Sequence, residues 1–279
     1  MSKIFDKVIS VFSSHPKGKE NGTETTKKAC STDSKAKVKQ NQNKKTVNKD
    51  KKKVVKEEHE FVDLGLPSGN LWAKCNIGAK LEYEIGDSFR FGEVEACELH
   101  ISDSGMFPIG KNRYIDALRR ITKYNTDSKW GIVDNKTELE TIDDAATVQW
   151  GGAWRTPTLK DWEELYENCN TERSTSKNGY LFISKNNGNY IFFPMRHFAG
   201  GTTFVEGKFY DNIGGYDYAN YMSSTLRQSV SMNYSQYVRD RRKKLPEVHE
   251  YTRIVSMEEK FPFYPFEIWR FVRPIHKKS

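Results

Sequence analysis

Apolar residues recur at helical spacing in one stretch near the middle of the chain. This stripe runs through DNKTELETIDDAATVQW, residues 134–150, and consists of Leu139, Ile142, Ala146 and Trp150. Residues that repeat every three or four positions share one face of a helix, so the pattern predicts a helix here. Gly151 and Gly152 follow, and we expect them to end the helix because glycine suits the conformation found after a helix C-terminus.

A second helix is predicted to begin at Thr158, in the segment TPTLKDWEELYENC. Thr158 and Asp161 have the spacing of a capping box, in which each side chain satisfies a backbone N–H of the other residue. Pro157 precedes the cap, where its missing N–H costs nothing. The expected buried face of this helix consists of Leu159, Trp162, Leu165 and Tyr166.

The two predicted helices are joined by WGGAWRTPT, residues 150–158, which concentrates two tryptophans, two glycines, an arginine and a proline. We interpret this stretch as architecture rather than as a catalytic loop. Trp154 is expected to be buried, and Arg155 is expected to bond a carboxylate or a carbonyl that the sequence does not identify. Structural roles are predicted for Trp72, Trp150, Gly151, Gly152, Trp154, Arg155, Pro157 and Trp162.

Both flanks of the helical region carry short apolar runs separated by turn residues, a pattern typical of strands. In the first flank, LPSG supplies Pro67 and Gly69 for a tight turn, and NLWAKCNIG is expected to be a strand. Later strands are predicted at GYLFIS and NYIFFPM, which flank the turn KNNG, and at GGYDYANYMSSTL and EIWRFVRPI. Strands, two helices and further strands, in that order, indicate an α+β domain over residues 61–279.

The first 60 residues differ from this domain in composition and charge. Residues 16–60 are dominated by Lys, Asn, Thr, Ser, Gln and Glu, and we predict a disordered linker because so little apolar surface cannot offset the entropy of ordering. Residues 1–60 hold 16 Lys and 8 Asp or Glu, which leaves 29 basic and 29 acidic residues elsewhere. The formal net charge of +8 thus belongs to the tail. No specific nucleic-acid surface is expected on the domain.

Within residues 1–15, positions 2–13 have the pattern of a short amphipathic helix. Its apolar face consists of Ile4, Phe5, Val8, Ile9, Val11 and Phe12. A helix of this kind docks in the groove of a partner or lies on a membrane surface. Alternatively, it packs on its own domain or frays, because short isolated helices are marginally stable. The sequence leaves these alternatives open.

The sequence contains none of the common short catalytic or metal-binding motifs. The six histidines form no HxH or HExxH motif, the four cysteines form no CxxC pair, and no GxSxG, Walker or GxGxxG motif occurs. We therefore expect no catalytic residue, no metal site and no cofactor, and we expect the cysteines to be free thiols. Asp143 and Asp144 are adjacent on the predicted helix and point about 100° apart. They are not expected to share a proton, and one of them is expected to face solvent.

Several longer blocks point to a family. The blocks VDLGLPSGNLWAKCNIGA, GDSFRFGE, VDNKTELETIDDAATVQWGGAWRTPTLKDWEEL, GNYIFFP, GYDYANYMSST and FVRPI occur in this order. Together they resemble the Fibrobacter succinogenes major paralogous domain, which is abundant in Bacteroidota, over residues 61 to about 276. The resemblance implies a C-type-lectin-like fold, with two helices around a small, twisted, mainly antiparallel sheet and with the domain's ends together. It implies a fold rather than a reaction.

The chain departs from that family in places. It has FGE at 91–93 and YMSST at 221–225, where the family usually has WGE and YWSSS. No export signal is recognised, because Asp6 and Lys7 interrupt the only apolar stretch at the N-terminus, and no run of about 18 apolar residues occurs. The location expected from sequence is therefore cytoplasmic, although the family is mostly exported or at the surface. The EPN, QPD and WND motifs of calcium-dependent sugar-binding lectins are missing, which disfavours that kind of site.

These observations predict a non-catalytic module on a flexible tether that binds an unidentified protein or glycan. Residues 210–239 are rich in Tyr, Asn, Ser and Gly, which make adaptable contact surfaces. The predicted ligand-binding residues are Tyr216, Tyr218, Asn220, Arg227, Tyr234 and Tyr237. Two alternatives stay open: an enzyme whose active site is assembled from distant residues of a lectin-like scaffold, and a ligand-display protein diversified by retroelements.

Overall fold

The computed structural model describes residues 59–277 apart from several short internal stretches. These stretches are residues 103–104, 109, 175, 199–200, 206–207, 213–215, 241–245 and 257–262. The chain divides into two units, residues 1–54 and 55–279, and every described residue belongs to the second. The predicted amphipathic helix at 1–15 and nearly all of the predicted linker at 16–60 therefore lie outside the described residues.

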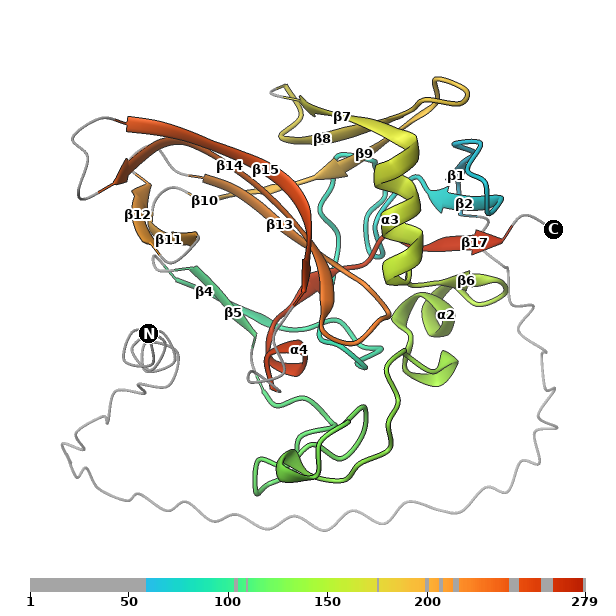
Figure 1. Cartoon of the computed structure of the whole chain (residues 1–279), viewed down its shortest axis with the longest axis vertical. Helices are drawn as coiled ribbons and strands as arrows, with labels where there is room; N and C mark the ends of the chain where they lie inside the picture. The colour runs from blue at the N-terminus through green and yellow to red at the C-terminus, as the bar shows by residue number, and fades with distance from the viewer. Residues whose placement is uncertain are drawn as a thin grey trace, which may run out of the picture. The chain divides into compact units, whose positions relative to one another are not determined.

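The predicted α+β class is confirmed, and strands outweigh helices (Figure 1). One four-stranded sheet has the order β1-β2-β17-β6, and its members are β1 (Phe61–Val62), β2 (Asn70–Ala73), β17 (Ile275–Lys277) and β6 (Trp154–Arg155). Strand β2 pairs antiparallel with both β1 and β17. The beginning and the end of the described domain therefore meet in one sheet.

The largest sheet has eight strands and is strongly curved in Figure 1. Its main path is β11 (Gly201–Val205), β12 (Lys208–Asn212), β14 (Gln228–Asp240), β13 (Tyr216–Met222), β16 (Arg270–Phe271) and β3 (Ser88–Phe89). Two more strands join it: β10 (Arg196–Phe198) pairs with β13, and β15 (Pro246–Ser256) pairs with β14. The predicted strand at GGYDYANYMSSTL is confirmed as β13, at the centre of this sheet.

A third sheet contains the predicted hairpin. Its strands are β7 (Cys169–Ser174), β8 (Gly179–Ser184) and β9 (Tyr190–Pro194), all antiparallel. Strands β8 and β9 flank the KNNG turn, and Gly188 in that turn has a φ of +77°, which glycine adopts without strain. A separate two-stranded ribbon is formed by β4 (Leu99–Ser102) and β5 (Gly105–Pro108).

The second predicted helix is confirmed as α3 (Leu159–Asn168). Thr158 and Asp161 form the predicted capping box, since each side chain accepts a hydrogen bond from the other residue's backbone N–H. The helix packs against β7, β8 and β14 (Figure 1). Trp162 and Leu165 are fully buried on the side that faces this packing, as the apolar spacing predicted.

The first helix prediction was wrong in length. Only α2 (Ala145–Trp150) is α-helical, preceded by a short 3-10 turn, η2 (Thr141–Asp143). The helix begins late because Asp144 acts as its N-cap and accepts a hydrogen bond from the backbone N–H of Ala146. Ile142 is 68% exposed, so it belongs to no buried stripe. The predicted end is confirmed, since Gly151 caps the helix with a φ of +68°.

The segment EIWRFVRPI was expected to be one strand and is instead interrupted. It begins in the short helix α4 (Tyr264–Glu267), continues as β16 and resumes as β17. Between the two strands lies Arg273, whose guanidinium is completely buried and hydrogen-bonded. The chain leaves one sheet to enter another at this point, which a continuous apolar run does not reveal. A further 3-10 turn, η1 (Ser128–Trp130), lies in the long connection before η2.

The main core lies between the three sheets and α3. Its largest side chains include Trp72, Trp162, Phe193 and Tyr221, and the rings of Trp72 and Trp162 are 4.9 Å apart. The predicted structural roles of Trp72 and Trp162 therefore match their complete burial. Among the helices that the structure describes, none is long and apolar enough to cross a membrane.

Candidate functional site

Of the six predicted ligand-binding residues, the structure describes the side chains of Tyr218, Asn220 and Arg227. Tyr218 and Asn220 share one face of β13, because residues two apart on a strand point the same way. Tyr234 on β14 lies opposite Asp217, whereas the residue opposite Tyr218 is Asn233. Arg227 lies in the turn between β13 and β14, with a φ of +63°. The side chains of Tyr216, Tyr234 and Tyr237 lie outside the described part of the structure.

Asn220 was expected to contact a ligand at the surface, and it is buried instead. Its Oδ1 atom has no hydrogen-bond partner, and the same is true of the buried Ser229 Oγ on the neighbouring strand. Tyr218 and Arg227 are partly exposed. The assignment of these six residues to one ligand-binding surface stays a prediction.

The opposite face of β13 changes character along its length. Tyr221 and Ala219 are completely buried in the main core. Asp217 occupies the next position on that face, at the outer end of the strand, where β10 and β14 both pair with it. The sheet face thus passes from apolar to charged at the point where it emerges from the core.

The carboxylate of Asp217 contacts two side chains from other strands, His197 and Arg173. Its Oδ1 atom is 2.8 Å from His197 Nδ1 on β10, and its Oδ2 accepts a hydrogen bond from Arg173 Nη2 on β7 at 2.9 Å. The side chains of Asp217 and Arg173 are only 12% and 8% exposed, whereas that of His197 is 61% exposed. Both carboxylate oxygens of Asp217 therefore have protein partners, and the imidazole of His197 is exposed to solvent.

Arg173 connects this pair to the third sheet. Its guanidinium donates to Asn178 Oδ1 at 2.8 Å and to the carbonyl of Gly179 at 3.0 Å. It also lies 5.9 Å from the ring centroid of Tyr180, which is its cross-strand neighbour on β8. These contacts fix the guanidinium fork, so that Asp217 has a preformed partner.

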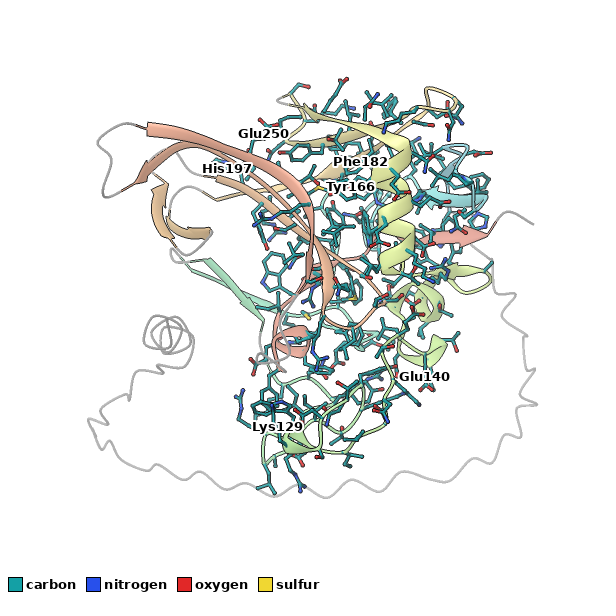
Figure 2. The ribbon with its side chains drawn as sticks, in the orientation of Figure 1. Lys129, Glu140, Tyr166, Phe182, His197 and Glu250 are labelled. Atoms are coloured by element: carbon teal, nitrogen blue, oxygen red, sulfur yellow. The ribbon has the colours of Figure 1, made fainter. Side chains whose placement is uncertain are left out.

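Tyr180 extends the network to β15. Burial raises the pKa of Tyr180, and the charge of Glu250 and a hydrogen bond to it raise that pKa further. Glu250 itself is exposed. We call these five residues the rim cluster: Arg173, Tyr180, His197, Asp217 and Glu250. Figure 2 labels its two exposed ends, His197 and Glu250, along the curved strands, with Tyr166 and Phe182 closer to α3.

Sequence reasoning did not find the rim cluster. His197 and Asp217 are 20 residues apart and Arg173 is 44 residues from Asp217, so no local motif links them. The pairing register of β10 with β13, which sets His197 opposite Asp217, is what brings the pair together. A polar residue at a core-facing strand position, such as Asp217 between Tyr216 and Tyr218, is the one signal that the sequence offered.

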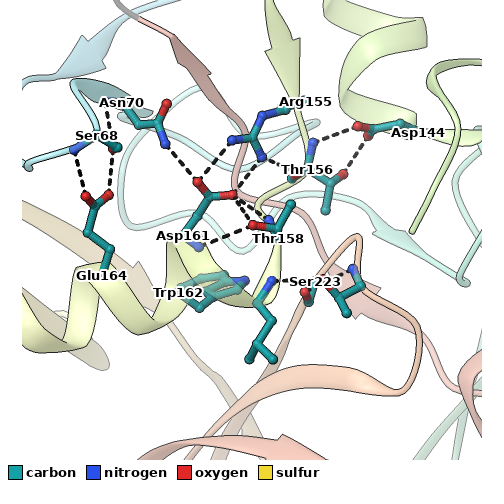
Figure 3. Close-up of polar contacts among 12 residues, drawn as sticks. Ser68, Asn70, Asp144, Arg155, Thr156, Thr158, Asp161, Trp162, Glu164 and Ser223 are labelled. Carbon is teal, nitrogen blue, oxygen red and sulfur yellow. Dashed lines mark hydrogen bonds and ion pairs between the residues drawn. The ribbon is translucent and has the colours of Figure 1, made fainter. Parts of the chain in front are cut away.

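The joint WGGAWRTPT proves to be a hydrogen-bonded junction (Figure 3). Arg155 donates to both carboxylate oxygens of Asp161, at 2.7 and 3.0 Å. Asn70 Nδ2 on β2 donates to the same carboxylate at 2.8 Å, and Thr158 donates through its backbone N–H at 2.7 Å. The expectation that Arg155 bonds a carboxylate is confirmed. The junction ties β2, β6 and α3 together.

Asp144 makes a second junction beside the first. It accepts hydrogen bonds from the backbone N–H and the hydroxyl of Thr156, at 2.8 and 2.6 Å. Because Asp144 also caps α2, one carboxylate joins the start of α2 to the residue after β6. About one turn further along α3, Glu164 accepts two hydrogen bonds from Ser68 (Figure 3).

The expectation that either Asp143 or Asp144 faces solvent was wrong, since both are buried. Asp143 Oδ1 accepts from Arg113 at 2.7 Å and from the Tyr114 hydroxyl at 2.5 Å. Its Oδ2 accepts from Lys123 and from the Tyr124 hydroxyl, both at 2.5 Å. Burial alone would raise the pKa of Asp143, but these hydrogen bonds lower it below its usual value. The residue organises the connection between β5 and α2.

The tryptophans of the joint are less buried than predicted. Trp150 is partly buried and packs against a small core cluster with Ala146 and Val272. Trp154 is also only partly buried, because β6 is an edge strand of its sheet. The expectation that Trp154 is a core residue was therefore wrong. Its ring instead contacts other aromatic rings near the domain's ends.

The three cysteines of the domain, Cys75, Cys97 and Cys169, are free thiols, as expected. Burial raises the pKa of all three, to about 11 for Cys169. A raised pKa keeps a thiol protonated at neutral pH and therefore weakly nucleophilic. Within the described residues, no group of three or more His, Cys, Asp and Glu side chains is placed to hold a metal ion.

Comparison with known proteins finds no matching family model, no similar curated protein and no similar solved structure. The resemblance to the Fibrobacter succinogenes major paralogous domain therefore rests on its sequence blocks.

Proposed function

We propose that the chain is a non-catalytic binding module with a C-type-lectin-like domain of the Fibrobacter succinogenes type, and that the rim cluster is part of its contact surface. The family assignment is supported by the ordered sequence blocks and by the meeting of the domain's ends, since β1 and β17 both pair with β2. The ligand class is a protein or a glycan.

The observation that carries the binding proposal is the contrast in exposure within the rim cluster. Asp217 and Arg173 are buried and engaged with each other, while His197 and Glu250 extend to the surface from opposite ends of the same network. A rigid, buried support beneath exposed hydrogen-bonding groups lowers the entropy lost on binding. Because His197 Nδ1 faces Asp217, the imidazole Nε2 and the Glu250 carboxylate offer hydrogen-bond acceptors to hydroxyl or amide donors of a ligand.

The directions of the pKa shifts also favour binding over acid–base chemistry. Shifts that place a group near neutral pH are typical of catalytic acids and bases. In the part of the chain that the structure describes, the shifted thiol and phenol pKa values rise and the shifted carboxyl pKa values fall. These shifts stabilise the ordinary protonation states of the resting protein.

A binding screen tests this proposal. Full-length protein is offered to a panel of glycans, peptidoglycan fragments and extracts of its host, alongside a His197→Ala/Glu250→Gln double variant. The matched control is Lys160→Ala, which alters an exposed residue on α3 away from the cluster. We expect a ligand retained by the wild type and the control and lost by the double variant. Equal retention by all three proteins would remove the rim cluster from the contact surface.

One observation favours the enzymatic alternative, namely the His197–Asp217 pair itself. A carboxylate that accepts from Nδ1 orients an imidazole and leaves Nε2 outward, which is the orientation of a general base. A panel of activated ester, phosphoester and glycoside substrates would test it. Turnover by the wild type that disappears in His197→Gln and Asp217→Asn variants would replace the binding proposal with this one.

A further inference from the structure

The two tryptophans of the joint stand at a right angle. The ring centroids of Trp150 and Trp154 are 5.1 Å apart, and the ring planes are 90° apart. The short loop between them contains Gly151 and Gly152, and a side-chain carbon added at either glycine would meet no atom within 4 Å. The pair is therefore held rigidly by α2 and β6 while open space adjoins the loop that connects them.

His59, at the start of the described domain, lies in the corner between these rings. Its imidazole stacks parallel on Trp150, with centroids 3.7 Å apart and planes 9° apart. Its plane is nearly perpendicular to that of Trp154, whose centroid is 6.1 Å away. The three centroid distances, 3.7, 5.1 and 6.1 Å, form a nearly right-angled triangle with its right angle at Trp150. The ring of Trp150 thus lies parallel to the face of His59, and the ring of Trp154 stands beside His59 at nearly a right angle.

Further rings extend this corner. His276 pairs with Trp154 across β17 and β6, and their ring centroids are 4.4 Å apart. Phe61 lies 5.2 Å from His276 and is 52% exposed. The corner consequently belongs to an aromatic surface built by the two ends of the domain and by the α2–β6 loop. Both ends are fixed by β-pairing, so the surface is preformed.

From this geometry we infer that the Trp150–Trp154 corner is a binding site for an organic cation, such as a quaternary ammonium or guanidinium group, which His59 occupies from within the chain. The face of an indole carries negative electrostatic potential and attracts a cation within about 6 Å of the ring centroid. Two indoles at a right angle contact a compact cation on two sides. The imidazole of His59 demonstrates that the corner accommodates a nitrogen-containing group in van der Waals contact with the ring of Trp150.

His59 competes with an external cation for the face of Trp150. It precedes β1 by one residue, Glu60, whose carbonyl accepts a hydrogen bond from the backbone N–H of Lys74. Rotation about the side-chain bonds of His59 would move the imidazole off Trp150 and keep that backbone pairing. An external cation then exchanges with the imidazole for the same surface. Replacement of His59 is therefore expected to raise the affinity for the external cation, and replacement of Trp154 is expected to lower it.

The test uses full-length protein, with tetramethylammonium chloride as the probe at pH 8, where an ordinary imidazole is neutral. Indole N–H signals in two-dimensional NMR report binding, and Trp150→Phe and Trp154→Phe spectra assign them. Sodium chloride at matched ionic strength is the salt control, and tert-butanol is the uncharged control of similar shape. We expect saturable shifts of the Trp150 and Trp154 signals in His59→Ala, and half-saturation of the wild type at a roughly 3- to 30-fold higher concentration.

The second variant, His59→Ala/Trp154→Ala, is expected to bind tetramethylammonium more weakly than His59→Ala by a similar factor. The indole signals of the buried Trp72 and Trp162 verify that it is folded, and His59→Ala/Trp154→Leu replaces it if it is not. The inference is overturned if His59→Ala shows no saturable shift, if tert-butanol shifts the same signals equally, or if removal of the Trp154 ring leaves the affinity unchanged.

Discussion

Arg155 and Asp161 form a two-pronged ion pair, with Nη1 2.7 Å from Oδ2 and Nη2 3.0 Å from Oδ1. The same carboxylate caps α3 through Thr158 and receives Asn70 from β2. Burial alone would raise the pKa of Asp161, but the hydrogen bonds from Arg155 and Thr158 lower it. One side chain therefore joins β6 and α3, which are neighbours in sequence, to β2, whose Asn70 is 91 residues from Asp161.

We expect Asp161→Asn to lower the free energy of unfolding by about 3 kcal/mol, because the guanidinium of Arg155 and the N-terminus of α3 lose their anionic partner. Urea unfolding followed by circular dichroism measures the change. Glu163→Gln, which neutralises an exposed carboxylate on the same helix, is the matched control and is expected to shift stability by less than about 0.5 kcal/mol. Equal effects of the two substitutions would contradict the central role of Asp161.

Asp143 makes stability depend on pH in a defined direction. Its folded pKa is lowered, so its contribution is fully present above the unfolded value of about 3.9 and is lost as pH falls through the folded pKa. Asp143→Asn removes this contribution. We expect the stability difference between wild type and variant to be largest near pH 6 and to shrink towards pH 3. Urea unfolding at several pH values measures it, and a difference independent of pH would contradict the assignment.

Local signals in the sequence predicted local structure well. The α3 capping box depends on residues three positions apart, and the β8–β9 hairpin depends on its own turn, so both were legible without tertiary information. The first helix failed because Asp143 and Asp144 serve tertiary partners: one binds Arg113 and Lys123, and the other binds Thr156. A helical stripe does not disclose such competition for its polar residues.

The candidate site was hidden for a related reason. Alternation along β13 sends Tyr218 and Asp217 to opposite faces, and composition alone does not reveal which residues share a face. The His197–Asp217 pair depends on strand register, and the stacking of His59 on Trp150 depends on the meeting of the domain's ends. Neither relationship is encoded within a single short segment.

The tryptophans of the chain are expected to differ in their contribution to stability. Trp162 is fully buried, its indole N–H donates to the carbonyl of Met222 at 3.1 Å, and Trp162→Ala should cost about 3–5 kcal/mol. Trp154 is only partly buried on an edge strand, so Trp154→Ala should cost less than half as much. Denaturant unfolding of both variants measures the difference. Equal costs would mean that Trp154 is a core residue after all.

Arg273 is expected to be among the least replaceable residues of the domain. Its guanidinium, completely buried, donates to Asn76 Oδ1 at 2.6 Å and to the carbonyls of Lys74 and Phe192 at 2.8 and 2.9 Å. Arg273→Met keeps an unbranched apolar stem but removes the guanidinium and leaves these acceptors unpaired, at about 1–3 kcal/mol each. We expect the variant to unfold at low urea concentration or to fail to fold. Near-native stability would show that other groups satisfy the acceptors.

The His197–Asp217 pair makes a prediction that needs no ligand. Because Nδ1 faces the carboxylate, neutral His197 should carry its proton on Nδ1 and leave Nε2 as the exposed acceptor. A free imidazole in water prefers the opposite tautomer, so long-range ¹H–¹⁵N correlation spectra at pH 8 distinguish the two. Asp217→Ala removes the acceptor and should return His197 to the Nε2-protonated form, while Glu250→Gln, at the other end of the rim cluster, should leave the tautomer unchanged. An Nε2-protonated His197 in the wild type would mean that Asp217 does not orient the ring, and the exposed acceptor of the proposed contact surface would be lost.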